Sequence, residues 1–289
     1  MAIQTQAKIP VLDFSSEDLK HGTGSWFSMR KQVCHALKEY GCFVVELGHK
    51  VSLQLHNKIF DAVGELFDFP TETKKKITYE KSLHGYASSA LHERLVIEEE
   101  GEIADSYVKQ MEELDKMVMR LVFENYGAEK YYNSHMESTT HTVAFLKYNE
   151  PQKTGTNTGL KNHTDKHFTF ILHQNRIKGL EIKTKNGEWI GFDPSPSTFI
   201  FLAADALQVW SNDRIEACVQ RVTLSTENEM RYSLELFAFN DGSICVPEEL
   251  NFDEDHPLQY RPLNILEYFK DQKAQASHGE LSVKAYCGV

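Results

Sequence analysis

The chain has 289 residues, a length that favours one large domain over several small ones. Its net charge of −11 argues against nucleic acid as a partner, because phosphate binding needs a basic surface. No apolar run reaches the length of a membrane span, and the five cysteines form no closely spaced pair, which indicates reduced thiols in a cytoplasmic protein. We therefore predict a cytoplasmic protein, a monomer by default, that acts on a small-molecule metabolite without nucleic acid or membrane.

The first 140 residues are predicted to be mostly helical. The predicted elements, in chain order, are a strand at 9–14, a helix at 26–40, a strand at 42–47, helices at 52–67 and 72–76, and a long amphipathic helix at 106–126. Ser52 is a typical N-cap, and Gly41 and Gly127 are typical stop residues. The pattern between 82 and 102 is weak.

Between 141 and 245 the sequence changes to short strands separated by turns. The predicted strands lie at 143–148, 168–173, 180–184, 189–192, 198–203, 217–222 and 231–239. Turn pairs such as Asn186-Gly187 and Asp241-Gly242 separate them. Many short strands with regular turns indicate a sandwich or a barrel. The remaining part, 246–289, is predicted to hold a helix at 264–276 and a tail, so that 1–289 forms a single domain.

Two polar side chains two residues apart provide the first candidate site. On an extended segment, His163 and Asp165 point the same way. An imidazole and a carboxylate suit Fe(II), which non-haem oxygenases hold with two histidines and one carboxylate. We predict a metal-binding or catalytic role for both residues. The alternative is an ordinary structural turn, because the pattern is short.

A second pair with the same spacing lies on a predicted strand. Arg231 and Ser233 place a guanidinium and a hydroxyl on one face, and these are donors that a carboxylate ligand needs. We predict that they bind the carboxylate of a dicarboxylic cosubstrate. The alternative for Arg231 is a surface ion pair.

The chain resembles the plant 2-oxoglutarate and iron(II)-dependent dioxygenase superfamily, in its AOP-like branch. The motifs that carry the resemblance span nearly the whole chain and lie at 9–13, 40–43, 67–70, 162–165, 179–182, 186–189, 210–212, 231–233 and 284–289. The resemblance implies a mainly β, α+β fold with a double-stranded β-helix (jelly-roll) core and flanking helices. It also implies Fe(II) and 2-oxoglutarate, with Arg231, Ser233 and Tyr148 on the far carboxylate of 2-oxoglutarate. Tyr148 could equally be a core aromatic.

The chain departs from this pattern at Gln220. The family has its distal iron-ligand histidine there, and Arg221 matches the arginine that follows that histidine. An amide is a poor iron ligand beside imidazole and carries no proton near neutral pH. His167, on the same side as His163 and Asp165, is a candidate replacement. The alternatives are an ordinary strand residue at 220 and a partly exposed histidine at 167.

Three functions remain open for this scaffold. The first is an enzyme of plant specialised metabolism that catalyses a redox-neutral step on a small, largely apolar metabolite, such as proton transfer, isomerisation, dehydration or cyclisation. Asp165 or His163 would act as base or acid, with Gln220 and His167 in the same site. The second is an Fe(II)/2-oxoglutarate hydroxylase or desaturase that tolerates Gln220. The third is a non-catalytic small-molecule-binding pseudoenzyme. In the first and third, iron and 2-oxoglutarate need not bind.

Overall fold

The fold is built on a main sheet of eight strands. This computed structural model describes residues 8–77, 84–97, 102–149, 157–224, 229–250, 257–275 and 281–289. The strands of the main sheet, in spatial order, are β1 (Val11–Asp13), β2 (Cys42–Glu46), β10 (Thr198–Ala203), β7 (Thr169–Gln174), β12 (Arg231–Asn240), β5 (Thr139–Tyr148), β4 (His92–Ile97) and β3 (Gly85–Ser88). Neighbouring strands are antiparallel, except that β1 runs parallel to β2.

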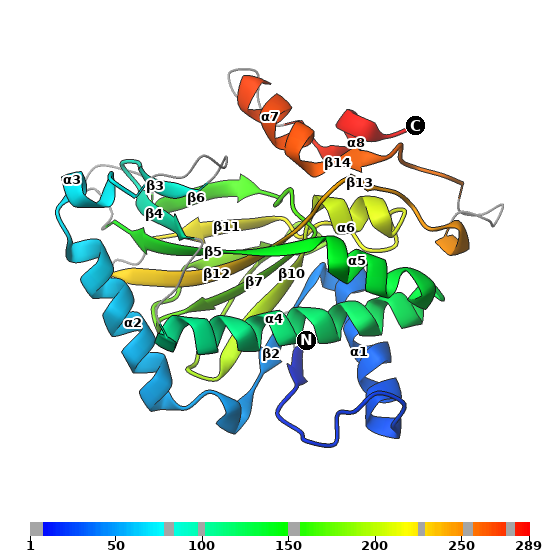
Figure 1. The fold of residues 1–289 in the computed structure, drawn as a ribbon, viewed down its shortest axis with the longest axis horizontal. Helices are drawn as coiled ribbons and strands as arrows, with labels where there is room; N and C mark the ends of the chain where they lie inside the picture. The colour runs from blue at the N-terminus through cyan, green and yellow to red at the C-terminus, as the bar shows by residue number, and fades with distance from the viewer. Residues whose placement is uncertain are drawn as a thin grey trace, which may run out of the picture.

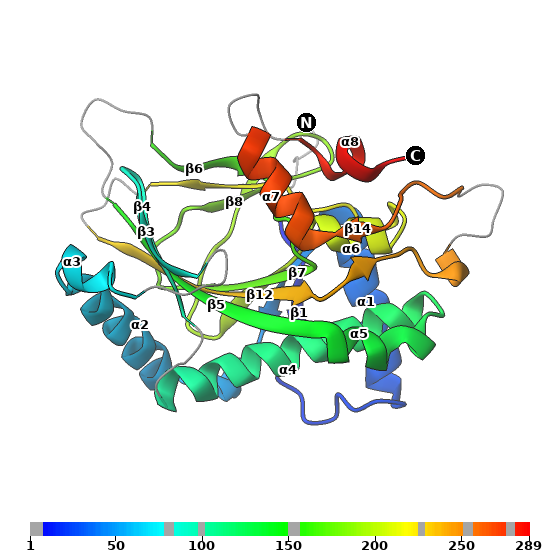
Figure 2. The same cartoon turned by 45° about the horizontal axis from the view of Figure 1, so that its top comes forward.

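A second, smaller sheet faces the main one. Its strands, in spatial order, are β6 (Thr158–His163), β11 (Gln220–Thr223), β8 (Leu180–Lys183) and β9 (Trp189–Gly191). Figure 2 separates the two layers, with β6 and β8 above β7 and β12. Two facing, mainly antiparallel sheets confirm the predicted jelly-roll core and α+β class. A short hairpin of β13 (Ser243–Ile244) and β14 (Leu263–Asn264) lies outside both sheets.

Helices cover the outer face of the main sheet. Figure 1 shows α1 (Gly24–Tyr40), α2 (Leu53–Asp68) and α4 (Glu102–Asn125) on this side, and α7 (Ile265–Gln275) and α8 (Val283–Cys287) on the opposite side of the molecule. The shorter helices are α3 (Thr71–Lys74), α5 (Tyr132–Ser138) and α6 (Asp205–Trp210). The side chains of Thr23 and Ser52 cap α1 and α2 by accepting backbone N–H hydrogen bonds. Gly41 ends α1 with φ +67°, in the left-handed region.

Two apolar clusters hold these layers together. One lies between the main sheet and the helices, where the rings of Phe43 and Phe201 stack at 5.2 Å. The other fills the space between the two sheets and includes Phe170, Leu172 and Ile182. Strands β7 and β10 are buried along their whole length because they contribute to both clusters. The inner cluster forms the surroundings of the candidate site.

Within the region of weak pattern between 82 and 102, the described segments 85–88 and 92–97 form strands, which the sequence analysis did not predict. Here β3 pairs with β4, and β4 pairs with β5 from Ile97 to His92. The first 140 residues therefore contribute four strands to the main sheet. The physical reason is that hydrogen bonding to β5, a partner distant in sequence, selects the strand conformation. The division into a single domain stays a prediction. Among the described helices, none is long and apolar enough to cross a membrane.

Candidate active site

The pairing of β6 with β11 brings the residues of the first candidate site together. In this antiparallel register, Gln220 lies directly opposite His163, and on its other side it pairs with Ile182 of β8. Asp165 follows β6, and its backbone oxygen accepts a hydrogen bond from the Asp205 N–H of α6 at 2.8 Å. Strand pairing and the start of α6 therefore position His163, Asp165 and Gln220 at one end of the inner cluster.

The carboxylate of Asp165 is the centre of this group. Its Oδ1 lies 3.8 Å from His163 Nε2 and 3.7 Å from His167 Nε2. The Gln220 amide nitrogen donates a short hydrogen bond to its Oδ2. The four residues named from the sequence thus meet around one carboxylate. Both Asp165 and His163 are about one-fifth exposed, so a small molecule can reach them from solvent.

The tautomer of His163 follows from its second ring nitrogen. His163 Nδ1 lies 2.8 Å from the backbone oxygen of Lys161, and a carbonyl oxygen only accepts hydrogen bonds. Nδ1 therefore carries a proton, and Nε2 lies 3.8 Å from Asp165 Oδ1. Histidines that ligate metals typically donate their other N–H to a carbonyl or carboxylate in this way. The same arrangement also suits a histidine that accepts a proton from a substrate.

The group does not fit an iron triad. The amide of Gln220 presents its N–H to Asp165, and a donor N–H cannot ligate a metal. The amide oxygen is neutral, and it is a weaker Fe(II) ligand than imidazole. Within the described ranges, no cluster of three histidine, cysteine, aspartate or glutamate side chains is arranged to hold a metal ion. The residues present therefore provide two of the three ligands that Fe(II) has in the family.

His167 is more fully buried than the sequence analysis predicted. It is 3% exposed, so the alternative of a partly exposed histidine is wrong. Its ring packs 4.6 Å from Phe237 and 5.9 Å from Phe170, which come from two other strands of the main sheet. Burial among these rings lowers the pKa of His167 to about 4, so its imidazole is neutral at physiological pH.

Arg231 is buried and incompletely paired. It is 3% exposed, which rules out the alternative of a surface ion pair. Its Nη2 donates to Gln174 Oε1 at 2.7 Å, and its guanidinium lies 4.4 Å above the Tyr148 ring. Arg231 Nε and Nη1 are buried without a hydrogen-bond partner among the residues described. A buried guanidinium with spare donors needs an anion, so the arrangement fits a carboxylate such as that of 2-oxoglutarate.

A glycine allows this close packing. A Cβ atom on Gly179 would lie 2.6 Å from the Thr223 backbone oxygen and 3.0 Å from Arg231 Cδ. Strand pairing holds that oxygen in place, so a larger residue would displace the arginine. Tyr148, on the other side of the guanidinium, is also buried at 3% exposure. The structure therefore places Arg231 beside Tyr148, while the Ser233 hydroxyl donates to Glu235. The role of the three residues on a carboxylate stays a prediction.

Glu235 is a site residue that the sequence analysis missed. It is buried on β12, opposite Ala144 and Leu172, and its Oε1 accepts a hydrogen bond from Ser233 Oγ at 2.9 Å. Burial raises the pKa of Glu235 to about 7, although the Ser233 hydrogen bond and the charge of Arg231 oppose this shift. The signal was present in the sequence, because Arg231, Ser233 and Glu235 alternate and must face the same side.

Comparison with known proteins identifies the family. Residues 125–240 match the 2OG-Fe(II) oxygenase superfamily, and residues 9–96 match the non-haem dioxygenase in morphine synthesis N-terminal family. The chain is 32% identical to the probable 2-oxoglutarate-dependent dioxygenase AOP1 of Arabidopsis thaliana, over 90% of this chain and 95% of the relative. The chain belongs to the 2-oxoglutarate and iron(II)-dependent dioxygenase family. This confirms the predicted resemblance to the AOP-like branch, whose family uses Fe(II) and 2-oxoglutarate.

Other members of the dioxygenase family support the fold. The rice dioxygenase for auxin oxidation superposes with a TM-score of 0.80 at 24% identity, covering 98% of this chain and 100% of that chain. The Arabidopsis dioxygenase for auxin oxidation, in a binary complex with 2-oxoglutarate, superposes with a TM-score of 0.75 at 26% identity, covering 86% and 99%. A further Arabidopsis relative, the probable inactive 2-oxoglutarate-dependent dioxygenase AOP2, is 26% identical over 98% of both chains.

Replacing Arg231 tests the carboxylate site of this dioxygenase-family chain. We expect Arg231→Gln to weaken 2-oxoglutarate binding at least about tenfold, because a charge-assisted hydrogen bond contributes about 1.5–3 kcal/mol. Titration calorimetry measures the affinity without added metal. The control is Arg221→Gln, which removes an arginine that pairs with Glu181 at 2.6 Å on β8 instead. Equal affinities of the parent and Arg231→Gln would contradict the assignment.

The buried carboxyl of Glu235 predicts a pH-dependent stability. Its pKa is raised from 4.5 to about 7 in the folded chain, so folding favours the protonated form. The stabilisation from protonated Glu235 is complete below pH 4.5. It is lost as the pH rises to 7, because Glu235 releases its proton at a lower pH in the unfolded chain than in the folded chain. We expect the free energy of unfolding of the parent, relative to Glu235→Gln, to fall over this window. Urea unfolding at a series of pH values measures this difference in unfolding free energy. Parallel curves of unfolding free energy against pH for the parent and Glu235→Gln would contradict the raised pKa.

Proposed function

We propose that this chain is an enzyme that uses the dioxygenase fold for a redox-neutral step on a small, largely apolar metabolite of plant specialised metabolism. The step is a proton transfer, isomerisation, dehydration or cyclisation. The observation that carries the proposal is the hydrogen bond from the Gln220 amide to Asp165. This hydrogen bond engages Asp165 Oδ2, a carboxylate oxygen that iron would need. Its donor, Gln220, stands at the position where the family has its distal iron-ligand histidine.

Carboxyl groups and a histidine supply the acid–base chemistry. Burial raises the pKa of Glu235 to about 7, so this group both donates and accepts protons near neutral pH. Asp165 Oδ1 and His163 Nε2 lie 3.8 Å apart. One of these groups takes a proton from the substrate, and another returns a proton at a second atom. No electrons are gained or lost overall, so the step needs no oxidant.

The surroundings of these groups favour an apolar substrate. The rings of Phe170 and Phe237 stack at 5.1 Å, and the neutral ring of His167 packs against Phe237. Such a wall orients a flat or branched hydrocarbon skeleton beside Asp165, and orientation lowers the barrier of a proton transfer. It also excludes water, which strengthens the electrostatic effect of each polar group.

The carboxylate site keeps a role in this proposal. Arg231, with its two unpaired N–H groups, would hold the far carboxylate of 2-oxoglutarate or a carboxylate of the substrate itself. In the family, 2-oxoglutarate supplies the electrons for oxygen activation when it is bound beside iron. Here the donor set around Asp165 lacks a third ligand, so we assign Arg231 to binding and orientation.

Specific observations favour each alternative. The Nδ1–H tautomer of His163 and the Arg231 site suit an iron-dependent hydroxylase or desaturase that tolerates Gln220. Similarity to a relative that is named probable inactive, at 26% identity, suits a small-molecule-binding pseudoenzyme. The lack of a third ligand counts against the hydroxylase or desaturase. The buried, titratable Glu235 counts against the pseudoenzyme, because binding alone does not need it.

Proton transfer can be followed without knowing the substrate. The protein, stripped of metal with chelator, is incubated with pooled plant metabolites in deuterated water without oxygen, and mass spectrometry follows each compound. We expect at least one compound to exchange deuterium or isomerise with the parent and about a hundredfold more slowly with Glu235→Gln. The control is Glu181→Gln, whose carboxylate pairs with Arg221. Turnover only with iron and oxygen would contradict the proposal, and binding without turnover would indicate a pseudoenzyme.

Substitutions at Gln220 test the incomplete triad directly. We expect Gln220→His to complete the ligand set and to convert 2-oxoglutarate to succinate when iron is added, because imidazole binds Fe(II) far better than an amide. The parent should show none of this conversion. The control is Gln220→Leu, which removes the hydrogen bond to Asp165 without adding a ligand and should remain inactive. Succinate formation by the parent would show that the chain tolerates glutamine as an iron-dependent oxygenase.

A further inference from the structure

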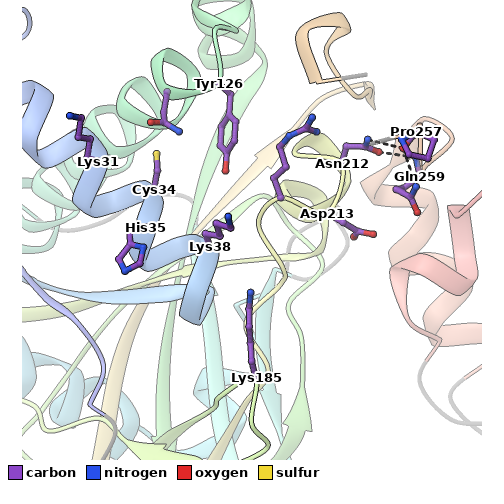
Figure 3. A pocket seen from close by; sticks show the side chains of 12 residues that line it. Lys31, Cys34, His35, Lys38, Tyr126, Lys185, Asn212, Asp213, Pro257 and Gln259 are labelled. Atoms are coloured by element: carbon purple, nitrogen blue, oxygen red, sulfur yellow. Dashed lines mark hydrogen bonds between the residues drawn. The ribbon is translucent and has the colours of Figure 1, made fainter. Parts of the chain in front are cut away.

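A cavity of about 720 Å³ lies away from the candidate active site. It is bounded by α1, the end of α4, the turn after β8 and the loop after α6 (Figure 3). Its lining residues include none of those that surround Asp165 or Arg231. The volume falls in the range of small-molecule sites, roughly 300–1,000 Å³. The cavity is therefore large enough for a metabolite with an organic part.

The cavity is positively charged although the chain is acidic. The cationic side chains that line it are Lys31, Lys38, Lys185 and Arg214. Among the lining residues that the structure describes, one carboxylate, that of Asp213, is present. Asp213 already accepts hydrogen bonds from Lys284 Nζ at 2.6 Å and Gln208 Nε2 at 2.9 Å. In a chain of net charge −11, this local excess of cations is a site for a negatively charged ligand.

Two of these lysines point into the same space. Figure 3 shows the ammonium groups of Lys38 and Lys185 and the hydroxyl of Tyr126 directed toward the middle of the cavity. Neither lysine forms an ion pair or a side-chain hydrogen bond within the described part of the chain. Unpaired cations that converge from separate elements repel each other, and an anion that binds between them reduces this repulsion. A ligand with two or more negative charges suits this arrangement.

Local structure holds the convergent groups in place. Lys31 and Lys38 lie seven positions apart on α1, so they share one face of the helix. Lys185 lies in the turn between β8 and β9, which is closed by the backbone hydrogen bond from Thr184 N to Glu188 O at 2.8 Å. Arg214 Nη1 donates to the Leu250 backbone oxygen at 2.8 Å, which fixes its guanidinium at the rim.

The walls also provide a place for the organic part of a ligand. The ring of Tyr126 and the buried thiol of Cys34 form an uncharged side of the cavity. Burial raises the pKa of Cys34 to about 12, so this thiol stays protonated and contributes as a small apolar group. Lysine ammonium groups act as point charges that bind phosphate well.

We propose that this cavity binds a phosphorylated small metabolite, with its phosphate groups between Lys38 and Lys185 and its organic part against Tyr126. The site is separate from the active site and independent of the reaction that occurs there. Its occupant carries at least two negative charges, because one carboxylate would leave most of the cationic groups without a partner.

Calorimetry with adenosine diphosphate as the probe tests this site, and uncharged adenosine serves as the comparison. We expect the parent to bind the diphosphate with a dissociation constant below about 1 mM at low salt and not to bind adenosine measurably. The double variant Lys38→Gln/Lys185→Gln should weaken binding at least about tenfold. The matched control, Lys58→Gln/Lys76→Gln, removes the same charge from exposed lysines on and near α2 and should change affinity less than twofold.

Each other outcome overturns the proposal. Absence of saturable binding by the parent would show that the cavity takes no phosphate. Equal losses in the two double variants would show that binding depends only on net charge. Loss of binding in Arg231→Gln, with the lysine variants unaffected, would place the probe in the active-site carboxylate pocket instead. Circular dichroism and melting temperatures confirm that the variants fold, which is expected because all four lysines are exposed.

Discussion

The hydrogen bond from the Gln220 amide to Asp165 joins the two segments that carry the candidate site, β11 and the residues that follow β6. A carboxylate inside a protein must be paired or hydrogen-bonded, because losing hydration is costly. The amide meets that requirement without bringing a charge or a metal. The register of β6 and β11 places Gln220 opposite His163, so the interaction is built into the sheet. The Asp165 carboxylate therefore has a hydrogen-bond donor that strand pairing holds beside it.

The polar residues of β12 differ in charge and in hydrogen-bond partners along the strand. Arg231 and Glu235 face the same interior. Ser233 lies between them on the strand, and its hydroxyl donates a hydrogen bond to Glu235. At one end, a buried guanidinium with unpaired donors stabilises an anionic group. At the other, burial keeps the carboxyl of Glu235 close to half-protonated near neutral pH. A molecule with one carboxylate and an apolar skeleton would be held at the first end and exposed to proton transfer at the second.

The sequence predicted the parts of the structure that depend on local patterns. Short apolar segments and turn residues located most of the core strands, but β6, which carries His163, was not predicted. Two-residue spacing placed His163 with Asp165 and Arg231 with Ser233. Strands β3 and β4 were not predictable, since β4 is defined by its pairing with β5. The burial of His167 was also not predictable from local sequence, because the rings that bury it come from β7 and β12. Glu235 could have been found by extending the alternation of β12 by one step.

Two apolar clusters surround the strands that carry the candidate site. Small metal-binding domains fold only when the ion is bound, because they lack a sufficient apolar core. Here Gln220 is flanked on its own sheet by Ile182 and Val222, which belong to the apolar cluster between the sheets. That cluster, together with the one beneath the helices, buries enough apolar surface to hold β6 and β11 in register. Apolar packing and strand pairing therefore hold Gln220 opposite His163.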